Sequence, residues 1–325
     1  MKQMSNVFGK FQTTFLVLSL VVSSLIIIAC DAPRQMADSN FDTKVARPAY
    51  TNEQPKVLFD EAHNNIHTTG GLYKPFVDLI KNDGYQVIAN KEVFSQKTLD
   101  GFSILVIANA LGANEANDNS AFTDAECDAV RDWVQSGGSL LLITDHAPTG
   151  AAAENLAKRF GVEMSKGMTE DSKNHDNTSG DTSQLVFSRE NGLLLEHPIT
   201  QGRDANERIN KVMSFTGQSL KTSENGTAFL KLGDSAMNRA ATVTVEKSGG
   251  DTRVLINYGE PTPAKDYAQT VALQFGKGRI VILGEAAMLT AQVDGKTKKP
   301  FGMNVKGIDN RQLALNIVHW LSRIL

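Results

Sequence analysis

The sequence predicts an α/β fold with a mostly parallel sheet and an added antiparallel β section. In the first half of the chain, short apolar runs alternate with amphipathic helical segments. Such runs are typical of parallel strands whose two faces are covered by helices. Between about residues 163 and 267, strand-like runs follow one another with turns between them, which indicates antiparallel pairing.

The N-terminal residues have the layout of a bacterial secretory leader. Lys2 and Lys10 precede an apolar run from Phe15 to Ile28, and no acidic residue accompanies them. The run leads into "IIAC", which resembles the lipobox of bacterial lipoproteins, where the cysteine is diacylated and becomes the new N-terminus. The resemblance implies a signal peptide over residues 1–29 and a lipid anchor on Cys30. The alternative is an uncleaved anchor helix.

A lipid anchor would hold the protein at a membrane of the cell envelope, on the periplasmic side. Asp31 resembles the signal that retains enterobacterial-type lipoproteins in the inner membrane, and the inner and outer membranes both stay open. The formal net charge is −3 and basic runs are missing, which argues against nucleic acid as a partner. Because Cys127 is the one other cysteine, the mature chain can form no intrachain disulfide, and we expect Cys127 to be a buried core thiol.

Residues 31–54 show no sustained apolar period, so we expect a tether over residues 30–54 and one α/β domain over residues 55–325. Thr123 and Glu126 form a capping-box pattern at the start of one helix. The segment "TVALQFGKGRIVILGE" predicts a hairpin. The other elements that we expect are strands 56–60, 85–89, 103–108 and 139–144, and helices 73–82, 123–136, 151–160 and 311–325.

Polar side chains follow four apolar runs at the point where each run ends. In an open parallel sheet, ligands bind beyond the carboxyl ends of the strands, so we expect these side chains to converge. Helix capping and solvation are the competing explanation for each of them taken alone. The residues in question are Asp60, Glu61, His63, Asn64 and His67 after the first run, Asn109 after the second, Asp145 and His146 after the third, and Glu285 after the fourth.

These residue types suit two kinds of chemistry. Asp60, His63 and His67 offer the oxygen and nitrogen ligands that zinc or another divalent metal accepts. Asp145, His146 and Glu285 are candidates for a catalytic acid or base. In the metal-free alternative, the same cluster binds a small polar ligand through hydrogen bonds, with Glu61, Asn64 and Asn109 as further ligand-binding candidates.

The segments "FTDAECDAVRDWVQSGGSLLLITDH" and "FGKGRIVILGE" resemble the class I glutamine-amidotransferase-like superfamily, especially its uncharacterised branches that are not amidotransferases. The resemblance covers about residues 55–162 and 268–325 and implies a flavodoxin-like three-layer sandwich. True amidotransferases have a nucleophilic cysteine after a core strand, whereas this chain has "VIANALGAN" there. The departure implies that the chain has no glutaminase activity.

Together these features lead to two functional expectations. The first is a membrane-anchored envelope lipoprotein with a polar strand-end site that acts as a metal-assisted hydrolase on a polar or carbohydrate-like substrate. The second is a non-catalytic ligand-binding or scaffolding module of an envelope or transport system. Fold alone cannot choose between them.

Overall fold

The computed structural model describes residues 35–325 except residues 53, 113–119, 224 and 249–250. The predicted signal peptide, Cys30 and Asp31 lie outside the described residues. In the part of the chain that is described, no helix is both long and apolar enough to cross a membrane.

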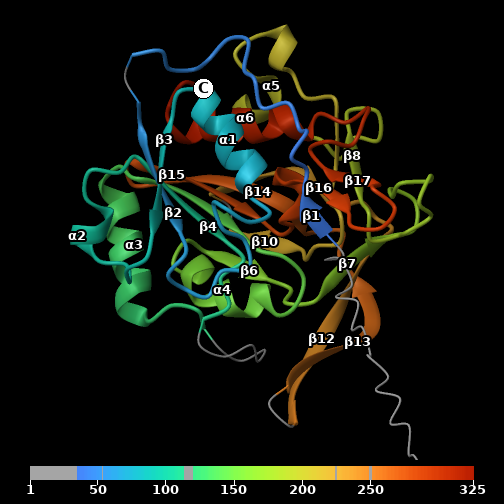
Figure 1. The fold of residues 1–325 in the computed structure, drawn as a ribbon. Helices are drawn as coiled ribbons and strands as arrows, with labels where there is room; N and C mark the ends of the chain where they lie inside the picture. Colours follow the sequence, from blue (N-terminus) through green and yellow to red (C-terminus); the bar gives the residue numbers. More distant parts are fainter. Residues whose placement is uncertain (1–34, 53, 113–119, 224, 249–250) are drawn as a thin grey trace, which may run out of the picture. The chain divides into compact units, whose positions relative to one another are not determined.

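A mixed nine-stranded sheet forms the centre of the fold (Figure 1). Five of its strands pair in parallel in the order β3-β2-β4-β5-β15. The alternation of apolar runs with helices therefore predicted the parallel part correctly. These strands are β2 (Lys56–Asp60), β3 (Gln86–Asn90), β4 (Ile104–Ala108), β5 (Ser139–Ile143) and β15 (Gly278–Leu283).

Helices cover both faces of the parallel strands. Because successive strand residues point to opposite faces, Phe59 packs with α1 (Lys74–Asn82) and α6 (Asn310–Leu321), whereas Leu58 packs in the core formed with α3 (Asp124–Ser136) and α4 (Thr149–Lys158). Figure 1 shows the two helix pairs on opposite sides of the sheet. The short helical elements are α2 (Gln96–Leu99), α5 (Pro198–Gln201), η1 (Ala205–Glu207) and η2 (Ala287–Leu289).

The predicted hairpin is confirmed, because β14 (Ala268–Phe275) pairs antiparallel with β15. Beyond β14 the central sheet continues through three short antiparallel strands, which are β10 (Leu220–Thr222), β6 (Val162–Met164) and β11 (Gly226–Lys231). The β-rich section is thus partly an extension of the central sheet rather than a single layer added to it.

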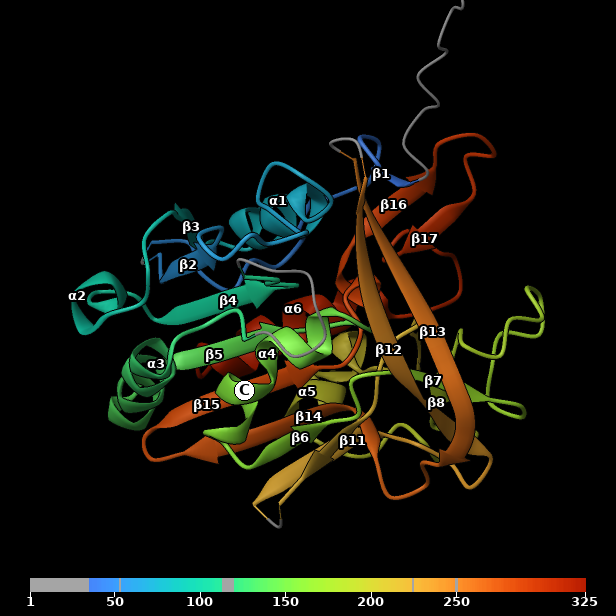
Figure 2. The same cartoon turned by 90° about the horizontal axis from the view of Figure 1, so that it is seen from below.

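The remaining described strands form three small sheets. One of them contains a long hairpin of β12 (Ala236–Ser248) and β13 (Asp251–Pro263), which extends away from the central sheet (Figures 1 and 2). The hairpin pairs with β7 (Met168–Asp171). The other two sheets join β8 (Val186–Ser188) to β9 (Lys211–Met213), and β1 (Gln35–Ala37) to β16 (Ala291–Asp294) and β17 (Pro300–Gly302).

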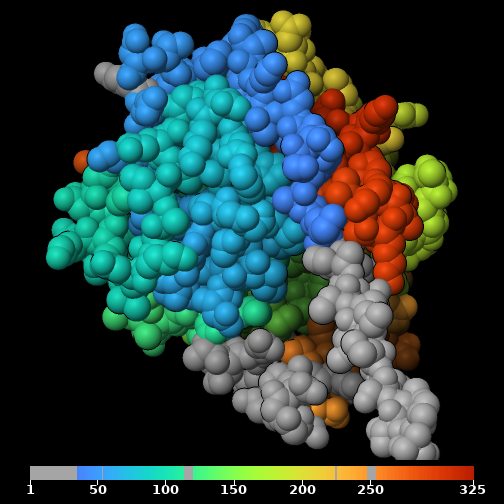
Figure 3. All heavy atoms as spheres, viewed as in Figure 1, coloured from blue at the N-terminus to red at the C-terminus, as the bar shows by residue number. Residues whose placement is uncertain are grey.

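The expected tether was wrong for residues 35–52. Gln35–Ala37 form β1 and pair with β16, so their backbone groups belong to a sheet. Phe41, Val45 and Tyr50 then pack against the core beside α1 and α6. Figure 3 shows this segment in blue, lying along the surface between residues near α1 and the C-terminal part of the chain. Widely spaced apolar residues that rest on a domain surface give no periodic signal, which is why the sequence pattern did not show them.

Candidate functional site

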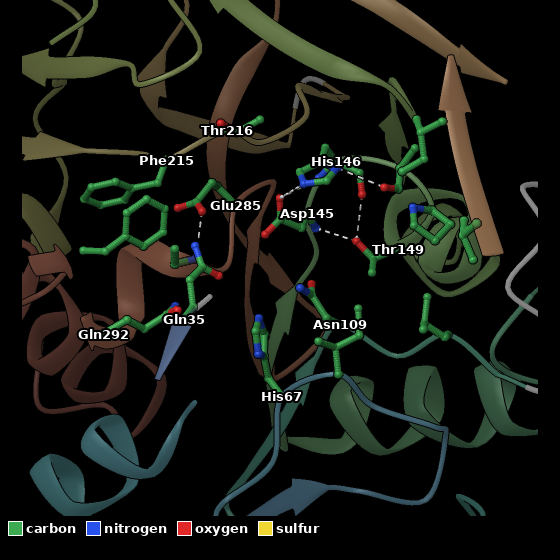
Figure 4. Close-up of a pocket in the computed structure, with 18 residues that line it drawn as sticks. Gln35, His67, Asn109, Asp145, His146, Thr149, Phe215, Thr216, Glu285 and Gln292 are labelled. Atoms are coloured by element: carbon green, nitrogen blue, oxygen red, sulfur yellow. Dashed lines mark hydrogen bonds and ion pairs between the residues drawn. The ribbon is translucent and has the colours of Figure 1, made fainter. Parts of the chain in front are cut away.

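A pocket of about 440 Å³ opens at the carboxyl ends of β4, β5 and β15. Five of the sequence-predicted residues line it, as the strand-end placement predicts, and their chemical roles stay predictions. These five are His67, Asn109, Asp145, His146 and Glu285. Figure 4 shows them arranged around the cavity, with Asp145 between Glu285 and His146.

Asn109 follows β4 directly and has a left-handed backbone conformation, with φ of 49°. Asparagine tolerates this conformation better than most residues. Its N–H donates to the carbonyl of Ile143 at 3.0 Å, and its own carbonyl accepts from the N–H of Ile66 at 2.9 Å. The backbone is therefore fixed on both sides, and the amide side chain is held at the pocket.

Asp145 and His146 lie in a tight turn between β5 and α4. The N–H of Asp145 donates to Thr149 Oγ1 at 2.8 Å, and that hydroxyl donates to the carbonyl of His146 at 3.1 Å. The Asp145 carboxyl accepts from the N–H of His146 at 2.7 Å and from the N–H of Ala286 at 3.3 Å. Its side chain is 16% exposed, whereas that of His146 is 38% exposed. His146 is thus the more accessible of the two.

Glu285 follows β15 and is completely buried. Its two carboxyl oxygens accept from the N–H groups of Ala287 at 2.8 Å and Met288 at 2.7 Å, at the start of η2. Helix capping, the competing explanation for strand-end acids, therefore applies to Glu285. The residue nevertheless also lines the pocket.

Asp145, which is partly buried, and Glu285, which is completely buried, both have raised pKa values. Burial raises the pKa of Asp145. Its interactions with His146 and with the Asn109 amide lower the pKa, but by less than burial raises it. Burial, together with the charge of Asp145, raises the pKa of Glu285 well above its ordinary value of 4.5. The pair therefore keeps a proton at a pH where exposed carboxyls have lost theirs.

His67 forms another part of the pocket wall and is buried against Tyr73, with ring centroids 5.0 Å apart. Tyr73 is held in turn, because its hydroxyl donates to the carbonyl of Ala286 at 2.7 Å. Burial lowers the pKa of His67 to about 4. The ring is therefore neutral at pH 7 and can offer a hydrogen-bond donor or acceptor but no charge.

Other pocket residues come from segments that the sequence analysis did not assign to a site. Phe215 and Phe301 contribute aromatic rings 4.4 Å apart, and the long hairpin contributes Val254 and Ile256. Tyr258 on the same hairpin lies 3.3 Å from His146 Nδ1 through its hydroxyl. These residues reach the pocket through distant chain segments, so no local sequence signal marks them. The further lining residues include Gln35, Leu111, Thr216 and Gln292.

Asp60 and His63 were expected in the shared site, and this expectation was wrong. His63 Nδ1 lies 2.9 Å from both carboxyl oxygens of Asp60, and its Nε2 lies 2.8 Å from Glu126 Oε1. Because carboxylates only accept, both ring nitrogens donate and the ring is positively charged. The ring is also enclosed by Phe94 and Phe122, with centroids 4.6 and 4.8 Å away. This cluster is a buried ion group that joins β2 to α3.

Glu61 and Asn64 also lie outside the pocket lining, contrary to their expected ligand-binding role. Glu61 Oε1 accepts from the N–H of Thr69 at 2.7 Å and from its hydroxyl at 2.6 Å, and Oε2 accepts from Lys91 Nζ. Asn64 is exposed and occupies a turn with φ of 51°. Both residues therefore shape the loop after β2.

The proposed metal ligands do not come together. Asp60 and His63 are bonded to each other and to Glu126, whereas His67 lies in the pocket. Among the described residues, no group of three or more His, Cys, Asp or Glu side chains is placed to hold a metal ion. The donor set Asp60, His63 and His67 therefore does not fit zinc or another divalent cation.

Three buried side-chain atoms at the pocket have no hydrogen-bond partner within the described protein. They are His67 Nδ1, Asn109 Oδ1 and Gln292 Oε1. Such atoms are uncommon in folded proteins because each costs free energy when it is buried without a partner. The three side chains that carry these atoms all line the pocket, which gives this part of its wall a polar character.

Comparisons with known proteins establish the fold but no family. No protein-family model matches the chain, and no curated protein matches it. A solved structure titled mmIFT52 N-terminal domain is similar with a TM-score of 0.57 and 13% identity, over 82% of this chain and 97% of that chain. This likeness shows a shared fold, and at such low identity it says nothing of function.

Two further solved structures are similar at lower TM-scores. A ThuA-like protein from Bacteroides uniformis has a TM-score of 0.36 and 13% identity, over 84% of this chain and 94% of that chain. A protein from Thermoplasma acidophilum that is described as a GMP synthase has a TM-score of 0.42 and 10% identity, over 84% of this chain and 97% of that chain. Neither likeness carries an argument about this chain.

Proposed function

We propose that the chain is an envelope lipoprotein, anchored through Cys30, whose pocket binds a small polar ligand rich in hydroxyl groups. The observation that carries the proposal is the set of three unpartnered buried atoms at the pocket, His67 Nδ1, Asn109 Oδ1 and Gln292 Oε1. Two of these atoms are amide oxygens, which need a hydrogen-bond donor from the ligand. Hydroxyl groups supply donors and acceptors at neighbouring positions.

The other walls of the pocket support a carbohydrate-like ligand. Phe215, Phe301 and Ile256 add apolar lining to the pocket besides its polar groups, and sugar rings likewise present apolar and hydroxyl-bearing faces. Pockets for small molecules combine these features, with a few convergent polar groups in a mostly apolar lining. The volume of about 440 Å³ lies in the range of about 300 to 1,000 Å³ that is usual for such sites.

Calorimetric titration of the full chain with monosaccharides, disaccharides and polyols tests this proposal. We expect Asn109→Ala and Asp145→Asn to weaken binding about tenfold or more, because the first removes an amide and the second replaces a carboxyl oxygen that accepts hydrogen bonds with an NH2 group that only donates. Asn82→Ala is the matched control, since Asn82 is an exposed amide at the end of α1. Failure of the whole panel to bind, or equal binding by Asn109→Ala, Asp145→Asn and the wild type, would contradict the proposal.

Hydrolysis of the bound ligand is a second candidate function, favoured by the raised pKa values of Asp145 and Glu285. A carboxyl group that stays protonated near neutral pH can act as a general acid, and its neighbour can act as a base. In such a reaction, Asp145 and Glu285 would supply the acid and the base. Release of nitrophenol from aryl glycosides, abolished by Asp145→Asn, would support hydrolysis, and release unaffected by this change would rule out the assigned acid.

We further assign the parallel half to a flavodoxin-like three-layer sandwich of the glutamine-amidotransferase-like kind. The assignment is supported by the sequence motifs and by the helices on both faces of the parallel strands. The alternative function is a scaffolding module that binds a partner protein at the rim of the same pocket. In that case no compound of the sugar and polyol panel would bind.

A further inference from the structure

A second cavity adjoins the pocket and is lined by three lysines and two aspartates. Its volume is about 510 Å³, and it shares Gln35, Phe215 and Phe301 with the first pocket. The two cavities therefore meet at the aromatic pair Phe215 and Phe301, whose ring centroids are 4.4 Å apart. A single elongated ligand could contact both cavities by passing along these rings.

Three exposed lysines line the second cavity, namely Lys211, Lys299 and Lys306. Within the described part of the chain, none of the three has an ion pair with an acidic side chain. In contrast, the first pocket is lined by Asp145 and Glu285 and by no lysine or arginine among the described residues. Among the described residues, the lysines that line the two adjoining cavities therefore all belong to the second one.

The two acidic residues of the second cavity are occupied by their own loops. Asp176 accepts from the N–H groups of Thr178 at 3.3 Å and Ser179 at 2.9 Å. Asp294 Oδ1 accepts from the N–H groups of Lys296 at 3.0 Å and Thr297 at 2.6 Å. These carboxylates order the turns in which they lie.

We propose that the second cavity is an anionic subsite, so that the two cavities together take an elongated ligand with a hydroxyl-rich group in the first and a phosphate in the second. The lysines Lys211, Lys299 and Lys306 would bind the phosphate, and Phe215 and Phe301 would contact the part that joins the two groups. The proposal rests on the function proposed above for the first pocket, and it names the ligand class as a sugar phosphate, either free or linked to a lipid.

Titration of the full chain with inorganic phosphate tests the second cavity independently of the first. We expect Lys299→Ser combined with Lys306→Ser to weaken phosphate binding about tenfold, because two ion pairs are lost. Lys56→Ser combined with Lys277→Ser removes the same charge at the opposite edge of the sheet and should leave binding unchanged. Binding should also weaken as ionic strength rises from about 0.01 M to about 0.15 M. Absence of phosphate binding, or equal binding by both double variants, would overturn the anionic subsite.

A comparison of glucose with glucose 1-phosphate tests the link between the two cavities. We expect the phosphate ester to bind at least about tenfold more tightly, with the difference lost in the Lys299→Ser and Lys306→Ser double variant. Equal affinity for the two probes would overturn a shared ligand. If phosphate binds through the lysines but neither glucose nor the other sugars bind, the function proposed for the first pocket fails and the anionic subsite stands.

The octyl phosphodiester of glucose distinguishes the two sources of such a ligand. Tighter binding than glucose 1-phosphate supports the subsite with a membrane-borne ligand, because the alkyl chain then adds contacts. Equal or weaker binding of the diester that still depends on Lys299 and Lys306 supports the anionic subsite with a soluble ligand. Binding of the diester that does not depend on these lysines would overturn it.

Discussion

Replacing His63 should lower the free energy of unfolding more than replacing His67. Its ring carries the charge that compensates two buried carboxylates, Asp60 and Glu126. His63→Ala would leave these acids without a cation, and breaking a buried ion pair typically costs about 3 to 5 kcal/mol. We expect a loss of this size in the free energy of unfolding in urea. His67→Ala, also buried but without an acidic partner, should cost less, and equal losses would contradict this account.

The same ion group predicts a pH window for stability. Burial lowers the pKa of His63, but its bonds to Asp60 and Glu126 raise it more, so the net pKa lies above 6.5. Burial raises the pKa of Glu126, but the Thr123 N–H and His63 lower it more, so the net pKa lies below 4.5.

The histidine contribution is therefore complete below its unfolded pKa of about 6.5 and is lost as pH rises through the higher folded value. The Glu126 contribution is complete above about 4.5 and is lost as pH falls through the lower folded value. We expect the difference in unfolding free energy between the wild type and His63→Ala to shrink as pH rises above about 6.5. A difference that does not change up to pH 9 would contradict a charged His63.

Sequence patterns placed some of these residues correctly and misplaced others for a physical reason. Asn109, Asp145 and Glu285 reach one pocket because each lies within two residues of the end of a parallel strand. His63 also follows a strand, but its position depends on Glu126, which lies 63 residues away and was predicted only as a helix cap. One carboxylate serves both purposes, since its Oε2 bonds to Thr123 and its Oε1 to His63. A pairing between distant segments leaves no local pattern.

At the scale of elements, the long hairpin of β12 and β13 brings one strand face to the pocket. Side chains of a strand alternate between its two faces, and Val254 and Ile256 line the pocket while Leu255 between them is 37% exposed. We expect Ile256→Ser to weaken ligand binding, because it removes apolar contact surface from the pocket. Leu255→Ser is the matched control on the other face of the same strand and should bind like the wild type. Equal effects of both changes would show that the hairpin acts on the site in another way.

The elements themselves were predictable to very different degrees. The parallel strands and the helices α1, α3 and α4 were placed within two residues, because a fully buried strand needs a continuous apolar run and α3 has a capping box that marks its start. The last helix was predicted to reach residue 325, whereas α6 ends at Leu321. The strands β1, β16 and β17 were not predicted, since strands of three or four residues are too short for a periodic signal. These short strands contribute Gln35, Gln292 and Phe301 to the pocket.

At the scale of the whole molecule, the sheet brings together two acids that lie 140 positions apart in the sequence. The pKa values of Asp145 and Glu285 are raised chiefly by burial. A raised carboxyl pKa contributes stability that is complete below the unfolded pKa and is lost as pH rises through the folded value. We therefore expect the wild type to lose stability relative to Asp145→Asn as pH rises from about 4 to about 8 in urea unfolding. A relative gain over this range would show that the carboxyl is stabilised in its ionised form.

The proposed lipid anchor gives a prediction for the intact protein in a bacterial cell. The proposal assigns lipidation to Cys30, whose preceding residues resemble a lipobox, and not to Cys127, which is completely buried in α3. We expect labelled palmitate to be incorporated into the wild type and into Cys127→Ser, and to be lost in Cys30→Ser. Palmitate incorporation into Cys30→Ser would rule out Cys30 as the site of the lipid anchor. It would also remove the argument that Cys30 holds the protein close to a membrane-borne ligand.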